Sequence, residues 1–382
     1  MPAVSASADP IDAARVRQVA LDAGLDAVGI TSAEPFEDAR QEIEWRRDQG
    51  LHGGMAFTFR NPGRSTEPRR TLPQARALVV AALAYVDPPA ATRPRTAPSG
   101  RVARYSWVDH YAVLRARLGQ VADLLVDHGW KAIVLADDNA LVDRAAAHRA
   151  GLGWFGKNAN LLLPGQGSWF VLGSVLTDAP LDADATTVPD GCGSCTRCLD
   201  GCPTAAIIEP GVIDARRCLA WLVQAPGAFP REHREALGDR IYGCDDCQEV
   251  CPPNRRALRL HSSASSEPAT AEAWVPLLEL LASSDEQLLA AHGRWYIPRR
   301  DPSYLRRNAL LALANTADPN DPDVVEAIAT SLRHPEPVVR AHAVWAARRL
   351  GHPELVEPLR TDPDPMVRDE MTAPTPTERA TR

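Results

Sequence analysis

Apolar residues in the first half of the chain alternate between helical spacing and short continuous runs. Residues 11–24 carry apolar side chains at helical spacing and end on a glycine, which predicts an amphipathic helix. The apolar runs at 25–31 and 76–85 are typical of buried strands. A longer amphipathic helix is predicted at 111–129, followed by a strand at 131–136. This order predicts a domain of the α+β or α/β class.

Proline and glycine mark the loops of the same domain. Residues 160–178 predict two strands joined by a turn at Pro164–Gly167, and residues 88–100, rich in proline and threonine, predict a loop. We expect a flexible N-terminus over residues 1–9 and a folded domain over residues 10–188.

The last third of the chain is helical and contains an internal repeat. Three segments share a proline, an aliphatic–arginine step and a helix of small residues, and their arginines are Arg306, Arg340 and Arg368. The pattern resembles HEAT-type repeats, in which pairs of helices stack into a solenoid. It predicts a helical repeat domain over residues 261–371, before a disordered tail at 372–382.

All eight cysteines lie between Cys192 and Cys251, in a predicted module of residues 189–260. Those at 192, 195, 198 and 202, followed by Pro203, form the C-x2-C-x2-C-x3-C-P run of bacterial ferredoxins. In that run three thiolates bind one cluster and the fourth binds the neighbouring cluster. A second set, at 218, 244, 247 and 251, ends on the same C-x3-C-P pattern.

Ferredoxin logic therefore assigns these cysteines to two [4Fe–4S] clusters. The ligands of the first are Cys192, Cys195, Cys198 and Cys251, and those of the second are Cys202, Cys218, Cys244 and Cys247. The alternative is structural zinc, which usually pairs two C-x2-C knuckles separated by a longer loop. Three cysteines in succession at spacing three favour iron–sulfur clusters, which would carry electrons to chemistry elsewhere in the chain.

The net charge and the hydropathy of the chain indicate which partners and which compartment to expect. The net charge of −7 argues against indiscriminate coating of nucleic acid, although residues 60–117 hold eleven arginines against three acids. No apolar run is long enough to span a bilayer, and the N-terminus lacks the features of a secretion signal. We therefore expect a cytoplasmic protein that does not enter a membrane, where clustered thiols are metal ligands or redox groups.

Neither a G-x-G-x-x-G motif nor a P-loop is present, so nucleotide binding has no sequence support. The candidate chemistry lies in residues 136–158, "ADDNALVDRAAAHRAGLGWFGKN", which follow the predicted strand at 131–136. An aspartate at a strand end could act as a general acid if burial raises its pKa. The alternative for Asp137 or Asp138 is a helix N-cap, which the residues alone favour.

The motifs together resemble the epoxyqueuosine reductase family. The resemblance rests on "GDRIYGCDDCQEVCPPN" (238–254), "GCGSCTRCLDGCPTAAI" (191–207) and "DR…RAGLGWFGKN" (143–158), and it runs along essentially the whole chain. It implies a nitroreductase-like cobalamin-binding domain, then the ferredoxin-like module, then HEAT repeats that bind tRNA.

The resemblance also implies the reaction. Epoxyqueuosine at the wobble position of tRNA is reduced to queuosine, with electrons passing from an external flavodoxin- or ferredoxin-type donor through the clusters to cobalamin. The cobalamin is expected without its lower base, because no D-x-H-x-x-G motif is present. Implied cofactor contacts are Arg104, Tyr105, Lys157 and Asn158.

The proton donor implied by the family is an aspartate in a pattern like D-[ST]-x-P-x-x-E-R. Matching Asp143 and Arg144 to its last two positions places Asp137 at the aspartate, although Asp138 is a neighbouring carboxylate. The family also carries Asp-Tyr-His where this chain has Asp109, His110 and Tyr111, so Tyr111 takes the place of the family's histidine.

For tRNA we expect a surface in which arginines bind phosphates and interleaved aromatic rings stack on bases. The stretch at 60–117 and "GRWYIPRRDPSYLRRN" (293–308) are the candidates. The predicted contacts are Arg299, Arg300, Arg306, Arg307, Asn308 and Arg340. The alternative is the solvated face of an arginine-rich solenoid.

Two other functions remain open on the sequence. A cobalamin reductive dehalogenase also combines clusters with cobalamin, but it typically carries a twin-arginine leader, which is absent here. A ferredoxin-like carrier on a HEAT scaffold would bind clusters but neither corrinoid nor tRNA. A single-substrate pocket beside a solenoid suggests a monomer.

Overall fold

The computed structural model describes residues 9–86, 94, 97–184, 187–261 and 272–374. Its contacts divide the chain into two units. The first comprises residues 1–89, 108–216 and 246–269, and the second comprises 90–107, 217–245 and 270–382. The segment predicted as the cysteine module, 189–260, contributes residues to both units, and its boundaries as a domain stay a prediction.

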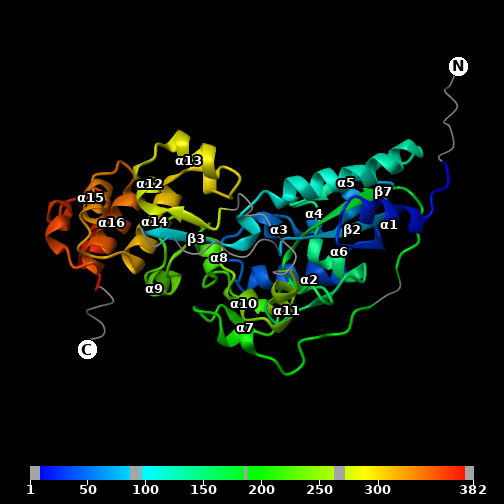
Figure 1. Cartoon of the computed structure of the whole chain (residues 1–382), viewed down its shortest axis with the longest axis horizontal. Coiled ribbons are helices and arrows are strands. Elements are labelled where there is room, and N and C mark those ends of the chain that lie inside the picture. Colours follow the sequence, from blue (N-terminus) through cyan, green and yellow to red (C-terminus); the bar gives the residue numbers. More distant parts are fainter. Residues whose placement is uncertain (1–8, 87–93, 95–96, 185–186, 262–271, 375–382) are drawn as a thin grey trace, which may run out of the picture. The chain divides into compact units, whose positions relative to one another are not determined.

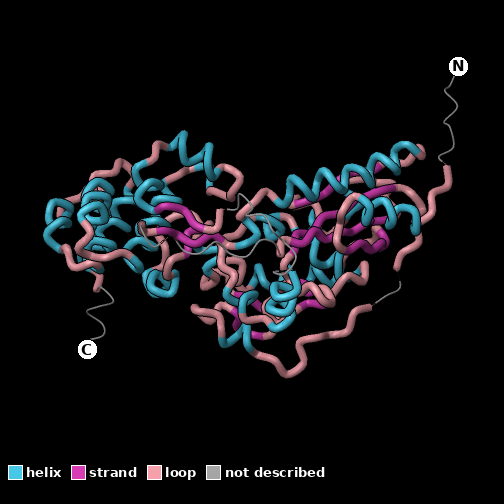
Figure 2. The backbone as a smooth tube through the Cα atoms, in the orientation of Figure 1, coloured by secondary structure: helices cyan, strands magenta, loops and turns pink. Residues whose placement is uncertain are grey.

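The first unit is built on a four-stranded antiparallel sheet (Figure 2). Its order is β1 (Ala27–Ser32), β2 (Ala77–Ala84), β7 (Phe170–Thr177) and β4 (Ala132–Ala136). The two central strands are continuous apolar runs because both faces are covered: every residue of β7, and all but the last of β2, is buried. The strand predictions at 25–31, 76–85 and 131–136 are confirmed.

Helices cover this sheet (Figure 1). The helix α5 (His110–Asp127) packs on β4 and β7 and contacts α1 (Ala13–Asp22), whereas α6 (Asp143–Arg149) packs on β1, β2 and β7. Asp109 caps α5, because its side chain accepts a hydrogen bond from the backbone N–H of Ala112. The remaining helices of this part are α2 (Glu37–Asp48), α3 (Phe57–Arg60), α4 (Pro62–Ser65) and the 3₁₀ turn η1 (Pro68–Arg70).

The cysteine-bearing segments of the first unit are short. They form α7 (Arg197–Asp200), the ribbon of β8 (Ile207–Glu209) with β9 (Val212–Ile213), α10 (Asp246–Glu249) and α11 (Pro252–His261). A small hairpin, β5 (Trp154–Phe155) with β6 (Leu161–Leu162), precedes β7. An isolated bridge between Leu163 and Gly167 closes the predicted turn at Pro164–Gly167.

The second unit joins a small sheet to a stack of helices. The sheet has the order β10 (Arg240–Tyr242), β3 (Ser99–Val102) and β11 (Trp274–Pro276). Part of the predicted loop at 88–100 lies outside the described residues, and its last two residues belong to β3. The short helical elements beside it are η2 (Arg104–Ser106), α8 (Leu219–Leu222), η3 (Arg231–His233) and α9 (Arg234–Leu237).

The helical repeats follow the small sheet, and α14 and α16 share one apolar core (Figure 1). The elements are α12 (Leu277–Ala282), α13 (Asp285–His292), η4 (Pro298–Arg300), α14 (Ser303–Thr316), α15 (Pro322–Ser331), α16 (Pro337–Arg349), η5 (Pro353–Leu359) and α17 (Pro365–Thr372). No helix in the described part of the chain is long and apolar enough to cross a membrane.

The repeated arginines have a structural explanation. Arg340 donates to the carbonyl oxygens of His334 and Pro335, and Arg368 donates to those of Asp362 and Pro363. In both cases the acceptors lie six and five residues before the arginine, so the repeat fixes the turn that leads into each helix.

Candidate functional site

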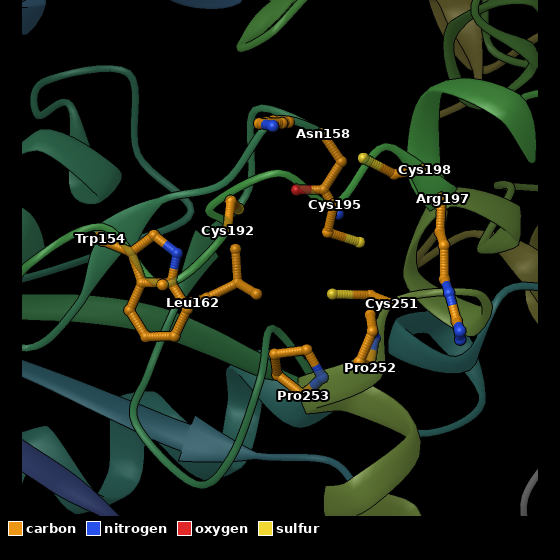
Figure 3. Close-up of a pocket in the computed structure, with 12 residues that line it drawn as sticks. Trp154, Asn158, Leu162, Cys192, Cys195, Arg197, Cys198, Cys251, Pro252 and Pro253 are labelled. Carbon is orange, nitrogen blue, oxygen red and sulfur yellow. The ribbon is translucent and has the colours of Figure 1, made fainter.

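Four of the predicted cluster ligands line one hollow in the first unit. Cys192, Cys195 and Cys198 come from the loop around α7, and Cys251 comes from the residue before α11. Figure 3 shows Cys195, Cys198 and Cys251 turning their sulfur atoms toward a common space. The hollow has about 480 Å³ of empty volume, counting space open to solvent. Four convergent thiols and this volume fit a [4Fe–4S] cluster.

The electrostatics of these thiols agree with that fit. Burial raises the pKa of Cys251 to about 11, and the neighbouring Cys192, Cys198 and Cys195 raise it further. Burial likewise raises the pKa of Cys198. Four thiolates that line one hollow repel one another unless iron neutralises their charge. The thiols would therefore stay protonated in the absence of a cluster, and a bound cluster would stabilise their ionised form.

Lys157 and Asn158, the predicted cofactor contacts after the β5 strand, also line this hollow. The Lys157 ammonium donates to the Gly193 carbonyl oxygen over 2.7 Å, and the Asn158 amide donates to the Cys247 carbonyl oxygen over 3.4 Å. Their polar groups therefore bind the backbone of the cysteine loops. A contact with cobalamin stays a prediction.

A buried hydrogen-bond network ties the last cysteine segment to the sheet. The Asn254 amide oxygen accepts from the Ser168 backbone N–H over 2.6 Å, and its nitrogen donates to the Ser168 hydroxyl over 2.9 Å. The same hydroxyl lies 2.9 Å from Gln248 Oε1. Gly167 has φ +68 and approaches Asn254 so closely that a Cβ would collide with it. Residues beside Cys247 and Cys251 are thus fixed to the turn that precedes β7.

The predicted ligands of the second cluster are divided between the units. Cys202 and Cys247 lie in the first unit, and Cys218 and Cys244 lie in the second. The Cys202 sulfur accepts a hydrogen bond from the Ala206 backbone N–H over 3.2 Å. The assignment of these four cysteines to one cluster stays a prediction.

Asp137 stands directly after β4 in an unusual backbone conformation. Its φ is 56, a left-handed value that a non-glycine residue adopts only at a cost. Among the described residues its carboxyl group has no hydrogen-bond or ion-pair partner. Burial raises the pKa of Asp137, the charge of Arg115 opposes the rise, and Asp138 and Asp109 add to it. The carboxyl is nevertheless exposed to solvent, as expected of a group that lines a depression.

The structure separates Asp137 from its neighbour Asp138. The Asp138 side chain accepts a hydrogen bond from the Ala140 backbone N–H over 2.8 Å, which closes the turn after β4. The helix α6 begins only at Asp143, and its N-cap, Val142, makes no side-chain capping bond. The N-cap alternative for Asp137 and Asp138 is therefore wrong, and Asp137 keeps a free carboxyl.

Three further ionisable side chains of this region, those of Tyr111, Asp143 and Arg144, interact electrostatically with one another, and the first two also interact with Asp137. Burial raises the pKa of Tyr111 above its usual range, and Asp137 and Asp143 raise it further. Burial also raises the pKa of Asp143 well above its usual range, and lowers the pKa of Arg144. Arg144 donates to the Ala159 carbonyl oxygen over 2.7 Å but remains exposed. Asp137 and Arg144 are thus exposed to solvent, whereas Tyr111 and Asp143 are half-buried.

The other predicted cofactor contacts, Arg104 and Tyr105, lie in the 3₁₀ turn η2 of the second unit. The Arg104 backbone N–H donates to the Asp245 carboxylate over 2.6 Å, and its guanidinium lies 4.4 Å from the Trp107 ring centre. Burial raises the pKa of Tyr105 well above its usual range, next to Tyr242. His110, in the first unit, packs its ring 5.3 Å from that of Tyr85.

Of the predicted RNA contacts, Arg299 and Arg300 are exposed. Both have φ 54, so two successive non-glycine residues adopt left-handed backbone. Arg299 donates to the Tyr304 hydroxyl over 2.8 Å, and Arg300 donates to the Gly293 carbonyl oxygen over 3.2 Å. Tyr296 lies nearby in the sequence and is 55% exposed. This short segment presents basic and aromatic groups to solvent.

Two of the other four predicted RNA contacts lie inside the fold. Arg307 and Asn308 have no exposed surface, and the Arg307 guanidinium donates to the carbonyl oxygens of four residues, Leu222, Val223, Ala225 and Gly227. Their burial leaves nothing to offer a phosphate, which corrects the prediction for these two. Arg306 pairs with Asp285, and the half-buried Arg340 binds both oxygens of Asp362 over 2.8 Å, so a phosphate contact of either stays a prediction.

Three family models match the chain. They are "4Fe-4S double cluster binding domain" at residues 191–254, "HEAT repeats" at 296–373 and "Epoxyqueuosine reductase QueG, DUF1730" at 66–138. The epoxyqueuosine reductase of Bacillus subtilis is 36% identical over 350 residues, which cover 88% of this chain and 87% of that protein. The chain belongs to the epoxyqueuosine reductase family. The Escherichia coli epoxyqueuosine reductase is 33% identical over 350 residues, 88% of this chain and 90% of that protein.

Solved epoxyqueuosine reductases match the fold as a whole. One, with an epoxyqueuosine-modified tRNA-Tyr stem loop, gives a TM-score of 0.84 at 33% identity and covers 94% of this chain and 96% of its own. Another, from Bacillus subtilis, also has a TM-score of 0.84, and its catalytic aspartate loop is swung out of the active site. The family, the iron–sulfur module and the HEAT repeats are confirmed, and the zinc alternative is wrong.

In this member of the epoxyqueuosine reductase family, the sequence identifies Asp143 and Arg144 only as positions of the family motif, and it predicts no role for Arg115. All three face Asp137 or Tyr111 in the structure. A usable signal was present, because an acidic residue at the start of a predicted helix lay one loop away from the candidate acid.

Proposed function

We propose that this chain reduces epoxyqueuosine in tRNA to queuosine. The observation that carries the proposal is the full-length match to a reductase solved with its epoxyqueuosine-modified stem loop, at 33% identity over 94% of this chain. Net removal of an epoxide oxygen as water consumes two electrons and two protons. The chain must therefore combine an electron path with a proton donor, and the candidate site offers both.

Two [4Fe–4S] clusters would supply the electron path. The first would be held by the thiols at 192, 195, 198 and 251 that line the hollow, and the second by those at 202, 218, 244 and 247. Each cluster passes one electron at a time, so two clusters suit a two-electron reduction. An external flavodoxin- or ferredoxin-type protein would reduce them.

Cobalamin, when bound, would supply a strongly reducing and nucleophilic cobalt toward the strained epoxide. Asp137 and Arg144, which are exposed, and Tyr111, which is half-buried, are the side chains that we expect to face this cofactor. The contacts expected from the family resemblance are Lys157 and Asn158, with Arg104 and Tyr105.

Asp137 would donate the proton to the opening epoxide oxygen. Its raised pKa keeps a larger share of the carboxyl protonated near neutral pH than a solvated aspartate would retain. Its left-handed backbone projects the carboxyl from the end of β4, where Asp138 cannot compete because its oxygen closes the turn.

Arg299 and Arg300, with Tyr296, would contribute to tRNA binding. Guanidinium groups would bind the phosphates, and the exposed ring would stack on a base. We expect a monomer that works in the cytoplasm, where tRNA and reduced carriers are available.

The test is conversion of epoxyqueuosine-tRNA by anaerobically purified protein with reconstituted clusters, added cobalamin and a chemical reductant. Nucleosides released from the tRNA are separated by chromatography and identified by mass spectrometry. We expect queuosine to appear with wild-type protein and to be nearly absent with Asp137→Asn at equal iron and corrinoid content. Full cofactor loading without any queuosine would refute the proposed activity.

A further inference from the structure

Asp143 has no role in the function proposed above, yet its surroundings are unusual for a carboxyl. It is the first residue of α6, and its Oδ1 atom is buried and has no hydrogen-bond partner in the part of the chain that the structure describes. An ionised carboxylate oxygen left without partners in such a place costs several kcal/mol, roughly, relative to water. The geometry therefore favours the neutral, protonated acid.

Ordinary helix stabilisation does not account for this arrangement. An acid in the first turn of a helix helps when it is ionised, because its charge then interacts favourably with the exposed backbone N–H groups. A neutral carboxyl loses most of that benefit. A proton stored on Asp143 thus serves another purpose.

The groups around Asp143 connect it to the candidate proton donor. Asp143 interacts electrostatically with Asp137 and Asp138 in the loop after β4 and with Arg144 on its own helix. Tyr111, on α5, interacts electrostatically with both Asp137 and Asp143, and burial raises the pKa of its phenol, which stays protonated over the whole physiological range. Arg115 acts on Asp137 from the same helix as Tyr111.

The stoichiometry of the proposed reaction requires a second proton, which a neighbouring acid would deliver faster than water. The first proton, from Asp137, goes to the epoxide oxygen as one C–O bond breaks, and leaves a hydroxyl on the neighbouring carbon. The second C–O bond breaks as that hydroxyl takes another proton and leaves as water, while the alkene forms. Two electrons come from the external donor through the clusters, and Asp137 must regain a proton between the two events.

We propose that Asp143, whose Oδ1 atom is buried without a hydrogen-bond partner among the described residues, stores the second proton and passes it to the Asp137 carboxylate. Asp143 does not touch the substrate and acts through Asp137. This inference rests on the proposed function for its kinetic consequence, but the storage of a proton on Asp143 is a property of the chain itself.

Infrared spectroscopy of the protein without cobalamin tests the storage directly. In heavy water at neutral pH, the Asp137→Asn variant is expected to retain a protonated-carboxyl stretching band that disappears in Asp137→Asn/Asp143→Asn. Its loss on raising the pH gives the proton affinity of Asp143. If Asp137→Asn shows no such band at neutral pH, the proposal is overturned, whatever the enzyme's activity.

Turnover of epoxyqueuosine-tRNA by the loaded enzyme tests the transfer. We expect Asp143→Asn to slow turnover by about 10- to 100-fold, because the second proton must then come from water. The fall in rate toward alkaline pH should follow two ionisations in the wild type and one in Asp143→Asn. Asp143→Glu should recover most of the rate, since it restores an acid.

Asp138→Asn is the matched control, because it removes a neighbouring carboxylate that is already hydrogen-bonded. It should keep two ionisations and a rate close to that of the wild type, with the alkaline fall moved to lower pH, because the charge of Asp138 raises the pKa of Asp137 and of Asp143. A wild-type rate and an unchanged profile in Asp143→Asn would overturn the transfer. If Asp143→Asn does not fold, Asp143→Glu replaces it as the test. A pH profile of Asp143→Glu identical to that of the wild type then supports proton transfer from residue 143. A hundredfold slower rate in a folded Asp143→Glu refutes it. Absence of turnover in the wild type would instead refute the proposed function and leave the infrared result standing.

Discussion

Two regions of the molecule hold their ionisable side chains in different ways. In the helical repeats, the buried Arg307 donates to four backbone carbonyl groups, and Arg340 is held by both oxygens of Asp362. Around β4 and α6, by contrast, the Asp137 carboxyl and the buried Oδ1 atom of Asp143 have no hydrogen-bond partner among the described residues.

The difference indicates what each set of charges does. A buried group whose donors are all satisfied stabilises one structure, and its charge is not available to a ligand. A carboxyl held in a dense environment without partners raises the free energy of its ionised form, which makes it a better proton donor at neutral pH. Composition alone cannot separate the two cases, since both regions are rich in ionisable residues.

The largest effect is expected from Asp137→Asn. Loss of the proton donor should lower the turnover of epoxyqueuosine-tRNA by roughly a thousandfold. The backbone should be unaffected, because asparagine tolerates the left-handed conformation found at this position. Single-turnover kinetics at saturating protein measure the rate, and thermal unfolding serves as the control. A rate within tenfold of wild type at full cofactor loading would contradict the role of Asp137.

Unlike Asp137→Asn, Arg307→Ala should lower the stability of the protein. It leaves the carbonyl oxygens of Leu222, Val223, Ala225 and Gly227 without their donor in a buried site, so the free energy of unfolding should fall by about 3–4 kcal/mol. The free energy of unfolding of Arg307→Lys should lie between those of the wild type and Arg307→Ala, because an ammonium group cannot bind four acceptors at once as the planar guanidinium does. Denaturant titration measures both variants. An unchanged unfolding midpoint for Arg307→Ala would contradict the structural role.

The same contrast explains what could be predicted from the sequence. Strands β2 and β7 were recognisable because a run of apolar residues buried on both faces leaves a pattern in the chain itself. The first cluster was recognisable because the cysteine spacing dictates the ligand geometry. The strand β3 was missed, since its four residues, "SGRV", follow a proline-rich stretch and pair only with partners far away in the sequence.

Burial of a single polar side chain left no such pattern. Arg300 and Arg307 occur in one stretch with similar neighbours, "IPRRDPSYLRRN", yet one is exposed and the other has no exposed surface. The acceptors of Arg307 lie about eighty residues earlier, so only the tertiary structure reveals them. The prediction of RNA contacts failed at Arg307 and Asn308 for this reason.

Acid should weaken the second unit more than its carboxylates alone would suggest. Burial lowers the pKa of His342 well below its usual range, and Arg234, Arg307 and Arg231 lower it further. Burial and Arg294 lower the pKa of His292 to about 4. Below about pH 6.5 these two histidines therefore bind protons in the unfolded chain but stay neutral in the folded chain, so the free energy of unfolding falls as the pH falls.

For these two histidines the loss between pH 7.5 and 5.5 should be about 2–3 kcal/mol, and it should level off for His292 near its folded pKa. Denaturant titrations at the two pH values measure it. The variant His342→Gln, which can still bond the Val338 carbonyl and the Phe229 N–H, should show a flatter dependence. An equally steep dependence in this variant would remove His342 from the explanation.

The smallest effect, and the sharpest test of the contrast between paired and exposed arginines, is expected from Arg300→Ala. Its side chain is exposed and makes one hydrogen bond, to the Gly293 carbonyl oxygen over 3.2 Å, so the unfolding midpoint should stay close to that of wild type. Affinity for a tRNA anticodon stem loop should fall by a factor of about 3–10, and the slope of log affinity against log salt should decrease by about one, because one phosphate contact is lost. Fluorescence anisotropy across a salt series measures both, with Arg333→Ala, an exposed arginine elsewhere on the repeats, as the matched control. If Arg300→Ala and Arg333→Ala bind the stem loop equally well, the exposed arginines of η4 are a solvated surface, and the RNA contacts must lie on other elements.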